Sequence, residues 1–238
     1  MQSFDQDELA QLTADLKLRP DPEPLEDLLA PRLPRIVLTG GPCSGKSKSL
    51  RLLGQVFGEL VQCVPEVVTW MIGQVGIRAP KTPVRDIRFV RELSLMRRSL
   101  ENLADQQARI DGKYAVVVDR GLIDAAAYRC LFGENIKYPF GPVEELMQII
   151  GSTREYEFGQ YDLVICLEVP PEEVFKDKRR NNPSRSKDYA NAARLGKSIA
   201  QVWGGHPNFH LIPNLGSWDD KYAAVRQLVS DFLEKLET

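Results

Sequence analysis

The chain has 238 residues, of which 43% are hydrophobic, and it carries a formal net charge of −2 at pH 7. This length suits one large domain, or one domain with an appendage, and the apolar content is enough for a buried core. The balanced charge argues against a general attraction for nucleic acids. Because the sequence shows neither a secretory signal nor an apolar run near 18 residues, we predict no export and no membrane span. Four cysteines without a C-x-x-C pair suit a cytoplasmic location.

The first 33 residues are expected to form an extension before the main domain, which would span residues 34–238. Apolar side chains set among acids predict a weakly amphipathic helix over residues 3–19: Phe4, Leu9, Leu12, Leu16 and Leu18. The prolines that follow give the composition of a linker. We favour a docked helix or a frayed tail over a partner-binding segment, because terminal segments are commonly ordered only where they dock.

The most specific motif starts at Gly40 and reads Gly-Gly-Pro-Cys-Ser-Gly-Lys-Ser, which matches the phosphate-binding P-loop. A buried strand is expected over 35–39 and a helix after the loop, so that the helix N-terminus adds its dipole to an anion site. Gly40 and Gly45 permit the positive φ that turns successive N–H groups toward phosphate oxygens. Lys46 should reach the β- and γ-phosphates, and Ser47 should ligate Mg²⁺. The predicted nucleotide-binding residues are Gly40, Gly41, Pro42, Cys43, Ser44, Gly45, Lys46, Ser47 and Lys48.

Two acids follow later strands. Asp119 ends the apolar run 114–118 in the layout of a Walker B motif, where a carboxylate holds Mg²⁺ directly or through water. Glu66 follows the expected strand 60–64. In one interpretation it accepts a proton from an attacking hydroxyl, or hydrogen-bonds the sugar of an acceptor. In the other it helps to begin the next helix. The sequence leaves these two interpretations equally open.

Strands and helices alternate along the rest of the chain. Strands are expected at 35–39, 60–64, 114–119, 161–169 and 208–212. Continuous apolar runs such as 114–119 are typical of strands buried on both faces of a parallel sheet. The clearest helix covers 84–110, and the last begins after Ser217, which is followed three residues later by Asp220. This pattern predicts a three-layer α/β sandwich with crossover helices.

A basic segment at 176–187 places six Lys and Arg residues among twelve and contains Asn-Asn-Pro. After the fourth strand of a P-loop domain, this composition is typical of a lid that closes arginines over a transferring phosphoryl group. The alternative is a solvated polar loop.

Two patterns are absent from the sequence: Asp119-Arg120-Gly121-Leu122 does not match the D-x-x-G switch of small GTPases, and no N-K-x-D element for guanine is present.

The chain resembles a P-loop ATPase/kinase family in the P-loop and in four further motifs: Val64-Pro65-Glu66, Asp119-Arg120-Gly121-Leu122-Ile123-Asp124, Tyr161-Asp162-Leu163-Val164 and Gly205-His206-Pro207. That family includes the kinase domain of bacterial ribosylnicotinamide kinase and the animal TRPL translocation-defect protein. The resemblance covers about residues 34–236. It implies a nucleotide-kinase sandwich whose five-stranded, mainly parallel sheet has the order 2-3-1-4-5. It also implies an acceptor-side acid at Glu66 and lid arginines among Arg179, Arg180 and Arg185.

From the motifs and the resemblance together we predict an ATP-dependent kinase of a nucleoside, nucleotide or related small molecule, with Mg²⁺ as cofactor and GTP as the alternative donor. Lys46 and the lid arginines would stabilise the transferred phosphoryl group, and Glu66 or Asp119 would handle the acceptor hydroxyl. Because the family mixes enzymes with nucleotide-binding regulators, the alternative is a regulator with little turnover. Such a regulator would act through a protein partner or a phosphoinositide headgroup. No nucleic-acid partner is expected.

Overall fold

The computed structural model describes residues 31–77, 83–132, 142–179 and 188–236, so the predicted extension lies almost entirely outside the described residues. The chain divides after Arg32 into two units. The second unit, Leu33–Thr238, holds all the strands of the described part of the chain.

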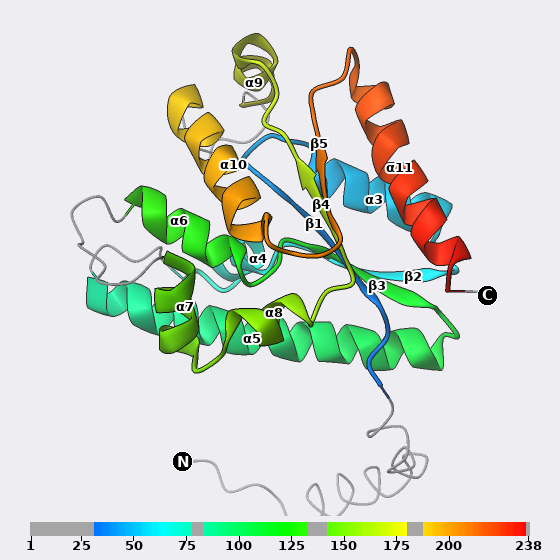
Figure 1. The fold of residues 1–238 in the computed structure, drawn as a ribbon, viewed down its shortest axis with the longest axis horizontal. Helices are drawn as coiled ribbons and strands as arrows, with labels where there is room; N and C mark the ends of the chain where they lie inside the picture. Colours follow the sequence, from blue (N-terminus) through cyan, green and yellow to red (C-terminus); the bar gives the residue numbers. More distant parts are fainter. Residues whose placement is uncertain (1–30, 78–82, 133–141, 180–187, 237–238) are drawn as a thin grey trace, which may run out of the picture. The chain divides into compact units, whose positions relative to one another are not determined.

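Five parallel strands form the centre of this unit, in the order β2-β3-β1-β4-β5 (Figure 1). They are β1 (Arg35–Gly40), β2 (Val61–Val64), β3 (Ala115–Asp119), β4 (Leu163–Leu167) and β5 (Phe209–Ile212). Every residue of β1, β3 and β4 is buried, as expected for strands that are covered on both faces. The order and the parallel pairing confirm the predicted α/β fold.

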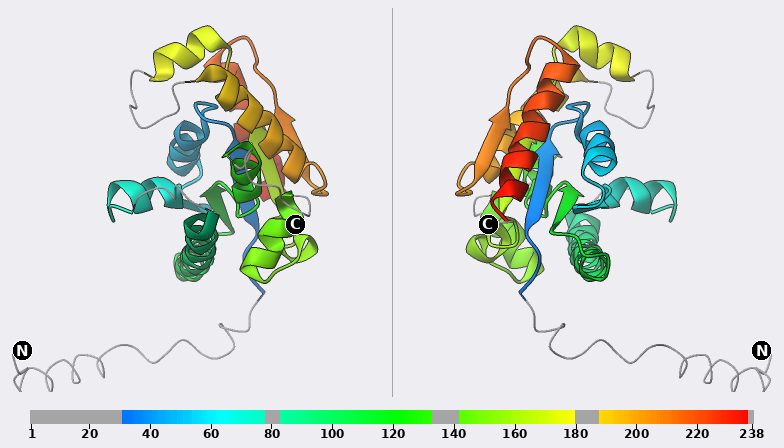
Figure 2. Two further views of the ribbon diagram at one scale, coloured as in Figure 1. Left: turned by 90° about the vertical axis from the view of Figure 1, so that its left-hand side faces the viewer. Right: turned by 90° about the vertical axis from the view of Figure 1, so that its right-hand side faces the viewer.

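Helices cover both faces of the sheet (Figure 2). In the described ranges they are α3 (Lys46–Val56), α4 (Val67–Gly73), α5 (Pro83–Ile110), α6 (Asp124–Phe132), α7 (Pro142–Ile150), α8 (Arg154–Phe158), α9 (Glu172–Arg179), α10 (Tyr189–Trp203) and α11 (Trp218–Glu234). None of these helices combines the length and the apolar character needed to cross a membrane.

Among the described residues, the two larger hydrophobic cores result from the alternation of side chains along the strands. Ile36 and Leu38 of β1 pack with α3 and α11 on one face of the sheet. Val37 packs with α5, α6, α7 and α10 on the other face. Because successive strand residues point to opposite faces, one short apolar strand contributes to both cores.

The predicted elements agree closely with the observed ones, apart from small shifts at their ends. The last helix begins at Trp218, as expected, because Ser217 and Asp220 form a capping box. The fourth strand is shorter than the expected 161–169. Single backbone bonds to the neighbouring strands continue just outside it: the Asp162 N–H donates to the Arg35 carbonyl at 2.8 Å, and the Glu168 N–H donates to the Ile212 carbonyl at 3.0 Å.

Candidate nucleotide-binding site

The loop between β1 and α3 has the backbone conformation that its motif predicts. Gly40 and Gly45 have φ values of 126° and 107°, in the region that favours glycine. A Cβ on Gly40 would lie 2.1 Å from the carbonyl oxygen of Leu167, so a side chain has no room there. Helix α3 begins directly after the loop at Lys46. Its free N–H groups and its dipole are therefore available to an anion in the loop.

Lys46 folds back over the loop. Its Nζ donates to the carbonyl oxygens of Gly40 at 2.9 Å and Gly41 at 2.8 Å, and lies 3.3 Å from the Ser44 hydroxyl. Burial and the nearby Arg120 lower the pKa of Lys46 to about 8, although neighbouring carboxylates oppose this shift. Phosphate oxygens would be stronger partners for this ammonium than the carbonyl groups that it now contacts.

Ser47 and Asp119 meet at the carboxyl edge of the sheet. The Ser47 hydroxyl donates to Oδ2 of Asp119 at 2.7 Å. The other carboxylate oxygen, Oδ1, is buried and has no hydrogen-bond partner among the described residues. Burial raises the pKa of Asp119, although Lys46 and Arg120 oppose the rise. An unpartnered carboxylate oxygen beside a hydroxyl suits the oxygen ligands that Mg²⁺ prefers, so these residues fit the metal that the motif implies.

Other ligands of such a metal would come from phosphate oxygens and water. The described residues contain no group of three or more His, Cys, Asp or Glu side chains that is arranged to hold a metal ion. This is the usual arrangement for Mg²⁺ at phosphate-transfer sites, where one or two protein oxygens share the ion with the substrate.

Arg120 directly follows β3 and joins the loop to two acids. Its Nε donates to Glu66, and its Nη1 lies 3.4 Å from Asp124 and donates to the Gly40 carbonyl at 3.2 Å. Arg120 has a φ of 74°, which is unusual for a residue other than glycine. Strain of this kind persists only where surrounding contacts enforce it, and it is common at functional sites.

Glu66 faces Arg120 from the position before α4. Its second oxygen accepts a bond from the Thr69 hydroxyl at 2.6 Å, and its side chain makes no capping bond to the helix. Burial alone would raise the pKa of Glu66, but Arg120, Thr69 and Lys46 together lower it to about 2. Glu66 is therefore ionised at neutral pH and is a weak proton acceptor.

Asp124, the first residue of α6, fixes the position of Arg120. One of its oxygens accepts bonds from the Thr39 hydroxyl and from Nε1 of Trp203, each at 2.6 Å. Asp124 is only 3% exposed, and Trp203 is fully buried. Sequence reasoning gave no role to Arg120, Asp124 or Trp203. Arg120 and Asp124 belong to a motif of the family resemblance, which could have drawn attention to them, whereas the Trp203 contact depends on the packing of α10 on α6.

The structure therefore brings Lys46, Ser47, Glu66 and Asp119 to one edge of the sheet. Lys48 contacts an aromatic ring beside the loop: its Nζ lies over the ring of Trp218, 4.5 Å from the ring centroid. Helix α9 ends at Arg179, whose side chain is outside the described part of the structure, as are Arg180 and Arg185. The lid arginines thus stay a prediction.

A family model described as an AAA domain matches residues 35–221, from the first strand into α11. This range contains the P-loop, Glu66 and Asp119. A search of the curated proteins found no match. The match covers most of the chain, and the chain therefore belongs to this AAA-domain family of P-loop nucleotide-binding proteins.

Proposed function

We propose that the protein is an ATP-dependent kinase of a nucleoside, a nucleotide or a related small molecule. The observation that carries the proposal is the ion pair beside the P-loop between the buried Arg120 and the partly buried Glu66. Nucleotide binding by itself uses the loop backbone, Lys46 and the metal-associated oxygens of Ser47 and Asp119. The additional pair supplies a cation for a phosphoryl group and an anion for a hydroxyl group, which are the two groups that react in a kinase.

In this proposal the cations stabilise the group that is transferred. The negative charge of a transferring phosphoryl group is spread over its oxygens, so Lys46 and Arg120 would act by electrostatic stabilisation. Mg²⁺, held by Ser47 and Asp119, would neutralise further charge on the phosphates. The lid arginines Arg179, Arg180 and Arg185 would add to this effect.

Glu66 would orient the acceptor rather than remove its proton. A carboxylate with a pKa near 2 holds a proton poorly. The transition state of phosphoryl transfer is loose and depends mainly on positioning, so a hydrogen bond from the acceptor hydroxyl to Glu66 would be sufficient. ATP is the proposed donor, with GTP as the alternative.

The test is a screen of acceptors. Nucleosides, nucleoside monophosphates and ribosylnicotinamide are each supplied with ATP or GTP and Mg²⁺, and the release of the nucleoside diphosphate is followed. We expect one class of acceptor to stimulate this release well above the basal rate. Product analysis should then find the phosphate on the acceptor.

Glu66→Gln tests the proposed role of the acid. We expect kcat/KM for the acceptor to fall by about tenfold or more, while the affinity for ATP changes little, because one charge-assisted hydrogen bond to the acceptor is lost. Glu59→Gln, which changes an exposed acid before β2, is the matched control. If the protein binds nucleotide but no acceptor stimulates turnover, the regulator replaces the kinase as the better account of the chain.

A further inference from the structure

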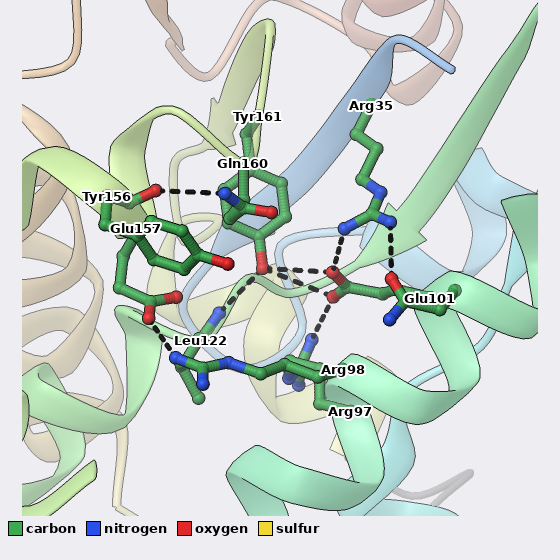
Figure 3. A pocket seen from close by; sticks show the side chains of 10 residues that line it. Arg35, Arg97, Arg98, Glu101, Leu122, Tyr156, Glu157, Gln160 and Tyr161 are labelled. Carbon is green, nitrogen blue, oxygen red and sulfur yellow. Dashed lines mark hydrogen bonds and ion pairs between the residues drawn. The ribbon is translucent and has the colours of Figure 1, made fainter. Parts of the chain in front are cut away.

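A second charged pocket lies between α5 and α8 (Figure 3). It has a volume of about 50 Å³, which is room for a few water molecules or one small ligand. The charged side chains that line it are Arg35, Arg97, Arg98, Glu101 and Glu157. We name it the arginine pocket. Its three arginines and two glutamates leave an excess of one positive charge.

The carboxylates of the arginine pocket already have partners. Glu101 accepts from Nη1 of Arg35 at 3.3 Å and from the Tyr161 hydroxyl at 3.2 Å. Glu157 accepts from Nη2 of Arg98. Both glutamates are therefore paired with other side chains of the pocket, and they do not need a bound cation as a partner.

The arginines, by contrast, retain unused donors. The Nε–H groups of Arg35, Arg97 and Arg98 are each buried and have no hydrogen-bond partner among the described residues. The side chains of Arg35 and Arg97 are only 4% and 5% exposed. A buried N–H of a charged group is costly without an acceptor, so such groups normally have water or an anion beside them.

We propose that the arginine pocket binds a small oxyanion, a carboxylate or a phosphate group, at a site separate from the P-loop. Guanidinium N–H groups match the oxygens of both kinds of anion. The pocket is accessible at Arg98, whose side chain is 37% exposed, and the polar side chains of Asn102 and Gln160 also line it. This site does not depend on the proposed kinase activity.

The test measures anion binding by the full chain while a non-hydrolysable ATP analogue with Mg²⁺ occupies the P-loop, because inorganic phosphate would otherwise bind at the γ-phosphate position there. Sodium acetate and sodium phosphate are titrated separately at constant ionic strength, with sodium chloride as the reference, and are followed by calorimetry. We expect saturable binding of at least one of the two. Acetate alone identifies a carboxylate site, and phosphate alone identifies a phosphate site.

Arg98→Gln removes one donor and its charge, and should weaken this binding by about tenfold or more. Arg154→Gln on α8 is the matched control, since Arg154 is similarly exposed and pairs with Glu144 at 2.7 Å outside the pocket. Gln160→Glu gives a second variant that keeps all three arginines: a negative charge among the lining residues should also weaken binding. A melting temperature close to that of the unchanged protein shows that each variant is folded.

Three results would overturn the proposal. The first is that neither anion binds more than chloride does, which would mean that the pocket holds only water. The second is that Arg98→Gln and Gln160→Glu, both folded, leave binding unchanged. The third is that Arg154→Gln reduces binding as much as Arg98→Gln does. None of these measurements uses turnover, so failure of the kinase proposal would not affect them.

Discussion

The P-loop site and the arginine pocket both place buried cations beside acids. They differ in the kind of hydrogen-bonding atom that is left without a partner. At the P-loop, Lys46 is bonded to carbonyl oxygens, and an acceptor, Oδ1 of Asp119, has no partner among the described residues. In the arginine pocket the carboxylates are paired, and the atoms that find no partner in the described part of the chain are N–H donors. The kind of missing partner therefore indicates the ligand better than the count of charges does: we expect a cation with its phosphates at the P-loop, and we propose an anion in the arginine pocket.

The largest expected effect comes from Lys46→Ala. It removes the ammonium that would bind the phosphates, so nucleotide affinity should fall by roughly a hundredfold or more in calorimetry. Lys48→Ala, which changes the lysine stacked on Trp218, should cost far less. Anion binding in the arginine pocket should stay the same, which separates the two sites. An unchanged nucleotide affinity in Lys46→Ala would contradict the P-loop assignment itself.

Asp119→Asn should act on the metal rather than on the nucleotide. The amide keeps the shape of the side chain but loses the charge that attracts Mg²⁺, so the affinity for ATP with Mg²⁺ should fall by about tenfold. Affinity for ATP in the presence of a chelator should change little. Asp111→Asn, at an exposed position after α5, serves as the control. Equal losses with and without Mg²⁺ would assign Asp119 a structural role.

The pH dependence of nucleotide binding tests the environment of Lys46. Its pKa of about 8 means that the free protein carries the charged ammonium below pH 8 and loses it above. Phosphates bind the charged form and raise this pKa, so affinity should be level below pH 8 and should fall by up to about tenfold per pH unit above it. Calorimetry in buffers of different ionisation enthalpy should then detect proton uptake. Lys46→Ala should abolish this slope, and a flat profile from pH 7 to 9.5 in the unchanged protein would contradict the assignment.

The smallest expected effect is a coupling between the two sites. Arg97 lines the arginine pocket and also donates to the carbonyl of Arg120, whose guanidinium lies at the P-loop. An anion bound beside Arg97 should therefore change nucleotide affinity by a few-fold, and nucleotide should change anion affinity by the same factor. Calorimetric titration of each ligand in the presence of the other measures both factors. If they are equal to one, the two sites are independent.

The parts of the site that the sequence predicted are local. The P-loop conformation depends on glycines within one short motif, and Asp119 is identified by the apolar run before it. The order of the sheet was correctly implied by the family resemblance. Arg120, Asp124 and the arginine pocket depend on contacts between distant segments: Trp203 and Asp124 are 79 residues apart, and Arg35 and Glu101 are 66 apart. No local pattern specifies such contacts, because the crossover connections of the fold create them.

The bond between Trp203 and Asp124 has an optical consequence. Trp203 is fully buried, whereas Trp70 is 48% exposed and Trp218 is partly exposed. Indole emission shifts to shorter wavelength in a dry environment and responds to the hydrogen bond of its N–H group. The protein should therefore show a blue-shifted emission component that arises from Trp203. Asp124 also contacts Arg120. Ligand binding that changes the partners of Arg120 should therefore alter this emission component, so that binding can be followed by fluorescence without an added label.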